Sequence, residues 1–264
     1  MAGTLSREPL ARAALSGGLG LWTSVDVVER TGSTNADLLA RGGPEGQVLV
    51  AEEQTAGRGR MGRSWVSQPG AALTFSVLLR PSGVPPARRG WLPLLAGVAV
   101  ATAVRSVAGV PATLKWPNDV LADDKKLAGI LGEQSGELVV VGIGINVATP
   151  SDALPVSPTG LPATSLLVEG ADVPRDTLLI EVLRQLERLY LAFREAPDPR
   201  RSGLLTSYVD LCATLGRVVR VELPGDRSVV GAAEGIDADG RLLVRETGTT
   251  SLTPIPAGDV IHLR

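Results

Sequence analysis

Three arginines, Arg58, Arg60 and Arg63, alternate with glycines in the segment GRGRMGR. The chain has no Asp or Glu between Gln54 and Asn118, so local positive charge dominates there. Guanidinium groups on a glycine-rich loop can wrap an anion, although ordering the loop costs roughly 1–2 kcal/mol of backbone entropy per residue. We therefore expect a loop that is mobile when free and closes on an anionic small molecule, keeping water from a reactive intermediate. A solvated basic loop is the alternative.

The same segment also satisfies the dinucleotide-binding pattern G-x-G-x-x-G, but its surroundings argue against that function. The pattern needs a helix that opens at the glycines and an acidic residue about 20 positions later. Here Ser64, Trp65 and a Gln-Pro-Gly turn follow, and the next acidic residue is Asp119. A phosphate-binding motif of the form G-x-x-x-x-G-K-[ST] does not occur. Any nucleotide must therefore bind through another architecture.

The scarcity of some residue types removes several kinds of chemistry. The chain has one cysteine, Cys212, and one histidine, His262, so an intrachain disulfide and a zinc site of Cys and His both lack residues. No metal held by protein side chains is expected. His262 lies in a run typical of a strand, which favours a structural role. Four Trp, two Tyr and two Phe are too few for base stacking, and the net charge of −2 does not favour nucleic acid.

The composition is that of a folded globular protein, with 264 residues, 44% hydrophobic and 20% charged. The longest uncharged apolar stretch, residues 91–104, is interrupted by Pro93 and Gly97 and is shorter than the roughly 20 residues of a membrane span. The N-terminal residues lack the apolar core of a secretory signal. We expect a cytoplasmic protein without a membrane segment.

The periodicity of apolar residues predicts an α+β domain followed by a small β unit. Strands are predicted at 25–28, 48–52, 73–80, 113–116, 126–133 and 138–147, and helices at 36–41, 91–107, 176–195 and 202–211. Thr34 and Asp37 have the spacing of a capping box, so a helix start is an alternative to a ligand-binding role for the segment around Thr34. Five short strands are predicted at 217–223, 227–233, 241–246, 250–255 and 259–263, as in a small closed barrel. The predicted divisions are a flexible segment at 1–22, an α+β domain at 23–214 and the barrel at 215–264.

Five motifs occur in a characteristic order: GSTN (residues 32–35), EQTAGRGRMGRSW (53–65), KWPNDV (115–120), KLAGIL (126–131) and GIGINV (142–147). With these motifs and similar gaps between them, the chain resembles biotin protein ligases. The resemblance implies a mixed sheet flanked by helices, as in class II synthetases, and an SH3-like C-terminal barrel. Longer members carry an N-terminal winged helix-turn-helix. Only 30 residues precede Thr31 here, so no DNA partner is expected.

The resemblance also implies a reaction, namely ATP-dependent activation of biotin to biotinyl-5′-AMP and its transfer to a lysine of a biotin carboxyl carrier domain. The implied biotin-binding residues are Ser33, Thr34, Asn35, Gln54, Gly57, Arg58, Lys126, Gly129, Gly142 and Gly144. The implied nucleotide-binding residues are Arg60, Arg63, Trp65, Lys115, Asn118, Lys126, Asn146 and Arg264, with Mg²⁺ on the phosphates. The implied catalytic residues are Lys126, Arg58, Arg60 and Asp119.

In that scheme the Lys126 ammonium offsets the repulsion between the biotin carboxylate and the α-phosphate, and Asp119 accepts a proton from the incoming lysine. Three structural alternatives to these roles stay open: Lys126 in a solvated charge cluster, Asp119 in a turn and Trp65 in the core. A lipoyl- or octanoyl-transferring relative is an alternative enzyme, although its glycine loops differ. The alternative outside enzymes is a non-catalytic module that binds anions or nucleic acid.

Overall fold

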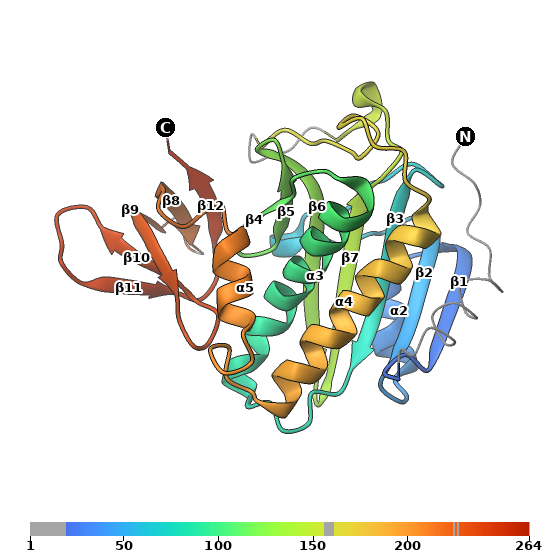
Figure 1. Cartoon of the computed structure of the whole chain (residues 1–264), viewed down its shortest axis with the longest axis horizontal. Helices are drawn as coiled ribbons and strands as arrows, with labels where there is room; N and C mark the ends of the chain where they lie inside the picture. The colour runs from blue at the N-terminus through green and yellow to red at the C-terminus, as the bar shows by residue number, and fades with distance from the viewer. Residues whose placement is uncertain (1–19, 156–160, 224, 226, 264) are drawn as a thin grey trace.

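A seven-stranded mixed sheet forms the larger of two units in the computed structural model, which describes residues 20–155, 161–223, 225 and 227–263 (Figure 1). Its strands are β1 (Ser24–Thr31), β2 (Gln47–Gln54), β3 (Ala72–Leu79), β4 (Thr113–Lys115), β5 (Asp119–Ala122), β6 (Lys125–Ser135) and β7 (Leu138–Asn146). They pair in the order β1-β2-β3-β7-β6-β5-β4, and only β1 and β2 are parallel to each other. The predicted mixed sheet is confirmed.

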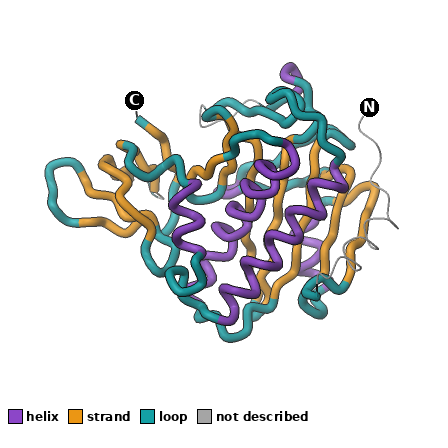
Figure 2. The backbone as a smooth tube through the Cα atoms, viewed as in Figure 1, coloured by secondary structure: helices purple, strands orange, loops and turns teal. Residues whose placement is uncertain are grey.

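Helices cover both faces of this sheet (Figures 1 and 2). The helices are α2 (Thr34–Arg41), α3 (Trp91–Ala108), α4 (Arg175–Glu195) and α5 (Leu204–Leu211), with short 3₁₀ turns at Arg60–Gly62, Pro86–Gly90 and Ser151–Ala153. On one face α3 and α4 pack against the sheet, while α2 covers the other through a separate small cluster around Leu38 and Leu49. The sheet is therefore apolar on both faces, which explains why β3 is buried along its whole length.

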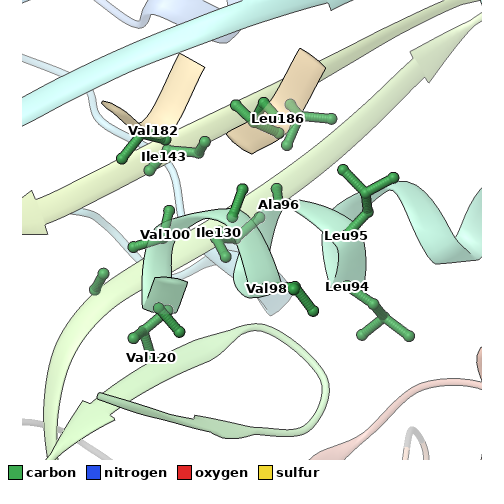
Figure 3. Packing of buried hydrophobic residues seen from close by; sticks show 14 of the residues in the cluster. Leu94, Leu95, Ala96, Val98, Val100, Val120, Ile130, Ile143, Val182 and Leu186 are labelled. Atoms are coloured by element: carbon green, nitrogen blue, oxygen red, sulfur yellow. The ribbon is translucent and has the colours of Figure 1, made fainter. Parts of the chain in front are cut away.

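Helix α3 is the centre of the core. Its small and branched side chains pack in one core with the sheet and α4, and Figure 3 shows Val100 and Ala96 beside Ile130 of β6, and Val182 of α4 beside Ile143 of β7. No membrane segment is predicted from the sequence, because only the shorter uncharged stretch 91–104 is considered there. By length and composition alone, the segment Pro86–Ala108 could cross a membrane. However, 67% of its most apolar window is buried in this core, as expected for the central helix of a folded domain.

Three details differ from the sequence-based expectations. The Asn-Asp pair at 118–119 is expected in a turn: Asn118 lies in one, but Asp119 begins β5, a four-residue strand too short to show a periodic pattern. The cap of α2 is Ser33 rather than Thr34: the Ser33 hydroxyl accepts from the Ala36 N–H, and Asp37 accepts from Thr31 instead of closing a capping box. Trp22 was assigned to a flexible segment, yet it is buried and its indole N–H donates to the carbonyl of Leu183.

The second unit is a five-stranded antiparallel sheet. Its strands are β8 (Val218–Leu223), β9 (Arg227–Ile236), β10 (Leu242–Glu246), β11 (Leu252–Ile255) and β12 (Asp259–His262). The order β11-β10-β9-β8-β12 leaves β11 and β12 at the edges, so within the described residues the predicted barrel is open along that seam. Alternating inward residues such as Val219, Val221 and Val244 give it an apolar core.

Two tryptophans of the larger unit fix the position of the small sheet. Trp91, at the start of α3, donates its indole N–H to the carbonyl of Ala238, and Trp116 donates to the carbonyl of Gly240. Both rings are buried, and both acceptors lie in the turn between β9 and β10. Each bond combines burial of a large apolar surface with satisfaction of a donor, which favours one fixed orientation of the two units.

His262 also lies at this junction, with the Thr214 hydroxyl 3.1 Å from its Nε2 and the Arg217 guanidinium 3.3 Å from its Nδ1. Arg217 in turn pairs with Asp124 of the larger unit. Burial, followed by the positive charges of Lys115 and Arg217, lowers the pKa of His262 from 6.5 to about 4, against the opposing effect of Asp124. The neutral imidazole is therefore the form that fits the folded chain.

We predict that this histidine makes folding sensitive to mild acid. Between pH 6.5 and about 4 the unfolded chain binds a proton on His262 that the folded chain excludes, so its contribution to stability is complete above pH 6.5 and is lost as the pH falls through this window. The free energy of unfolding, measured by urea titration at several pH values, should therefore fall more steeply in the natural protein than in His262→Gln. Parallel curves for the two proteins would contradict the prediction.

Candidate active site

The predicted site residues converge on one cavity of about 300 Å³. Its walls come from the N-terminus of α2, strands β6 and β7, the segment 58–63 that we call the arginine loop, and the beginning of β12. The predicted residues that line it are Ser33, Thr34, Asn35, Gln54, Arg58, Arg60, Arg63, Trp65, Lys115, Asn118, Asp119, Lys126, Gly129, Gly142, Gly144 and Asn146. Gly57 lines an adjoining hollow beneath the loop, and Arg264 lies outside the described residues.

Uncharged hydrogen-bonding groups form one end of the cavity. The Thr34 N–H donates to Gln54 Oε1 at 2.8 Å, and the Thr34 hydroxyl lies 3.0 Å from the same oxygen. Ser76 Oγ donates to Asn35 Oδ1 at 2.6 Å and lies 2.7 Å from Thr34 Oγ1. Ser76 is fully buried and was not found from the sequence, because its neighbours in β3 read only as an apolar strand. This end suits a neutral, polar ligand group.

Gly129, Gly142 and Gly144 form one flat wall of the cavity, which we call the glycine floor. A Cβ at Gly142 would lie 2.3 Å from Asn35 Oδ1, and one at Gly144 would lie 2.3 Å from the indole of Trp65. Gly129 pairs with Gly144 in neighbouring strands, and a Cβ there would lie 3.2 Å from the same indole. At Gly142 and Gly144 a side chain would collide with groups that already lie against the strands.

Trp65 occupies that floor itself. The resemblance assigns its ring to the nucleotide, whereas here the indole lies over Gly129 and Gly144, which the same resemblance assigns to biotin. Its Nε1 is buried and has no hydrogen-bond partner among the described residues. A ligand that reaches these strands must therefore displace the ring, since both cannot contact the glycines at once.

A close ion pair lies at the other side of the floor. Lys126 Nζ is 2.6 Å from Asp119 Oδ1, and both side chains are mostly buried. They meet because β5 and β6 are antiparallel neighbours. The backbone of Lys126 is held on both sides, since its N–H donates to the carbonyl of Pro162 and its carbonyl accepts from the N–H of Thr164. Lys126 therefore projects from fixed backbone rather than from a solvated turn.

The arginine loop is a tight turn with three cationic arms. The Gly59 N–H donates to the Arg63 carbonyl, and Met61 adopts the left-handed conformation with φ of 54°. Arg60 donates to Asn118 Oδ1 at 3.1 Å, while Arg58 lies 3.6 Å from a carboxylate of β6. The loop is thus compact in itself but is joined to the sheet mainly through its side chains.

The small sheet supplies a carboxylate that the sequence analysis missed. Asp259, the first residue of β12, accepts from Arg63 at 2.7 Å across 196 positions of sequence. Burial lowers the pKa of Lys115, while Asp119 opposes that effect. Burial likewise lowers the pKa of Arg60, opposed first by Asp259 and then by Asp119. Positive charge is therefore concentrated here and partly balanced by the two aspartates.

Uncharged hydrogen-bonding groups, a glycine floor covered by Trp65 and clustered cations in one cavity suit a ligase that joins a carboxylic acid with an uncharged head to a nucleotide. The Biotin/lipoate A/B protein ligase family model matches residues 27–148, and the Biotin protein ligase C terminal domain model matches residues 214–263. The chain is 46% identical to biotin--[acetyl-CoA-carboxylase] ligase of Mycobacterium tuberculosis, over 92% of this chain and 90% of that protein. It therefore belongs to the biotin protein ligase family.

Solved structures agree with this assignment. Biotin protein ligase from Aquifex aeolicus in complex with biotin and ATP superposes with a TM-score of 0.77 at 30% identity, covering 92% of this chain and all of that one. The Leishmania major enzyme in complex with biotinyl-5-AMP gives a TM-score of 0.62 at 26% identity, covering 92% and 99%. Both similarities extend over the larger unit and the small sheet together.

We predict that ligand binding changes the fluorescence of Trp65. The other tryptophans are at most 3% exposed and lie in the core or at the junction, whereas Trp65 covers the floor that a ligand must reach. Adding biotin and ATP should therefore shift the emission of the natural protein, and Trp65→Phe should remove most of that shift. A shift of full size in Trp65→Phe would assign the signal to another tryptophan and contradict the displacement.

Proposed function

We propose that the chain activates biotin with ATP to form biotinyl-5′-AMP and then transfers the biotinyl group to a lysine of a biotin carboxyl carrier domain. The observation that carries the proposal is that Lys126, paired with Asp119, lines the same cavity as the uncharged groups of α2 and the cations of the arginine loop. The relatives support it, because one is named a ligase for acetyl-CoA carboxylase and others hold biotin, ATP or biotinyl-5-AMP. The supply of ATP also favours a cytoplasmic reaction.

In the first step, a carboxylate oxygen of biotin attacks the α-phosphorus of ATP. A bond from oxygen to phosphorus forms, the bond from the α-phosphorus to the bridging oxygen breaks, and pyrophosphate leaves. Two anions must approach each other in this step. A cation between them offsets their repulsion and lowers the activation barrier, because it stabilises the charge that develops in the transition state. Lys126 would be that cation, and Arg60, Arg63 and Lys115 would hold the phosphates.

In the second step, the amine of the carrier lysine attacks the acyl carbon of the adenylate. The bond from that carbon to the phosphate oxygen breaks, AMP leaves, and the amine loses a proton. Asp119, the carboxylate paired with Lys126, would accept that proton once phosphate has drawn Lys126 away from it. The same carboxylate can thus orient the cation in one step and serve as base in the next.

Magnesium fits this site as a companion of the triphosphate. Among the described residues, no group of three or more His, Cys, Asp or Glu side chains could hold a metal alone. Mg²⁺ commonly keeps several waters and binds through phosphates with one or two protein oxygens, which Asn118 and Asp119 offer here. When bound, it would neutralise phosphate charge.

Exchange of labelled pyrophosphate into ATP tests the first step. We predict exchange that requires biotin, is not supported by lipoate, and falls at least about 100-fold in Lys126→Ala because the transition state loses its central cation. The neighbouring Lys125→Ala is the matched control, since Lys125 pairs with the exposed Asp123 and does not line the cavity. Exchange without biotin, or equal loss in both variants, would count against the proposal.

Limited trypsin digestion tests closure of the arginine loop. The Arg58 side chain is 57% exposed, so cleavage after residues 58–63 should be rapid in the free protein. Biotin and ATP together should slow it, because ligand contacts then stabilise the closed loop. Cleavage after Arg201, exposed in the turn between α4 and α5, provides an internal reference that should change little. Equal slowing at both places would show general stabilisation rather than closure.

A further inference from the structure

Glu133 connects two walls of the site that are far apart in sequence. It lies in β6, at the edge of the hollow beneath the arginine loop. Its Oε2 accepts from Asn35 Nδ2 at 2.8 Å, and its Oε1 lies 3.6 Å from Arg58 Nη1. One oxygen thus contacts the neutral end of the cavity and the other contacts the loop.

The contact with Asn35 fixes how this carboxylate points. Asn35 is 4% exposed, and its amide nitrogen also donates to the carbonyl of Leu131 at 3.2 Å. Its amide oxygen accepts from Ser76 and leaves no space for a side chain at Gly142. An amide with donors and acceptor engaged on three sides cannot rotate freely. It therefore holds Oε2 of Glu133 and leaves Oε1 directed at the loop.

The contact of Glu133 with Arg58 is weaker than its contact with Asn35, and its strength depends on how much solvent reaches it. The two side chains are 57% and 26% exposed, so solvent screens the pair in the free protein. A ligand under the loop excludes water and raises the strength of the same pair without any change in its partners. The pair therefore favours the closed loop most when the cavity is filled.

We propose that Glu133 is a positioning residue for biotin: oriented by Asn35, it holds Arg58 and so sets the arginine loop over the bound ligand. The inference rests on the proposed function, since it concerns the same site. It predicts an effect on biotin affinity that passes through Arg58. A purely structural role in the hairpin of β6 and β7 predicts instead a loss of stability that does not depend on Arg58.

Glu133→Gln separates these roles, because its amide oxygen can still accept from Asn35 while the charge opposite Arg58 is lost. We expect the Kd and KM for biotin to rise about five-fold, the ratio that ~1 kcal/mol produces. The value of kcat at saturating biotin and ATP should stay within about two-fold, and the melting temperature without ligand should not change. In an Arg58→Gln background, the Glu133→Gln substitution should add no further effect on the Kd.

Glu137→Gln is the matched control. Glu137 follows β6 in the same hairpin and lies 3.4 Å from Arg89, outside the cavity. The Glu137→Gln variant should have the same Kd for biotin as the natural protein. An unchanged Kd in Glu133→Gln, or an equal further loss in the Arg58→Gln background, would overturn the inference while biotin-dependent exchange in the natural protein leaves the proposed function standing. Absence of that exchange would instead remove the proposed function.

Discussion

Concentrating positive charge in a small, largely buried cavity is the physical constraint on which the rest of the site depends. Apart from the more exposed Arg58, the cations are Lys115, Lys126, Arg60 and Arg63. Like charges at short range destabilise one another, and burial adds a desolvation cost. Asp119 and Asp259 offset both effects, since they oppose the lowering of the pKa values of nearby cations. The free protein therefore carries its own counter-ions where the proposed substrate would bring phosphates.

This arrangement gives the ion pairs two uses. In the free protein Asp119 pairs with Lys126, and Asp259 pairs with Arg63. When phosphates bind, they can replace the carboxylates as partners of the cations at little net change in charge pairing. In the proposed reaction Asp119 would then be available as an acceptor for the proton of the carrier lysine, so binding of the phosphates would prepare the group needed by the second step. A site with cations alone would have neither this stability nor this sequence of roles.

The requirement for Asp259 explains why the two sheets must be fixed to each other. Asp259 belongs to the small sheet, and the Arg63 that it holds belongs to the loop of the larger unit. The indole bonds of Trp91 and Trp116 to the β9–β10 turn, together with His262 at the junction, set that relation. The contacts that stabilise the junction therefore also determine where Asp259 lies relative to Arg63.

Sequence predicted the parts of this structure that local patterns encode. The long helices and most strands followed from periodicity, and all the site residues implied by the motifs except Gly57 and Arg264 line the cavity. Glu133 and Asp259 did not, because each acts through a partner 98 or 196 positions away, and an isolated carboxylate in a strand has no local signature. The strand that begins at Asp119 was missed for a related reason, since four residues stabilised only by their neighbours look like a turn.

Trp65 shows the same limit in its energetics. Its motif implies a role against the nucleotide, whereas in the structure the ring lies against Gly129 and Gly144. The indole removes apolar surface from water there, but its Nε1 is buried without a partner among the described residues, and an unsatisfied donor costs about 1–3 kcal/mol. Because these two contributions oppose each other, the ring is held on the glycines only weakly, and this weak hold is the physical basis of the predicted displacement by a ligand.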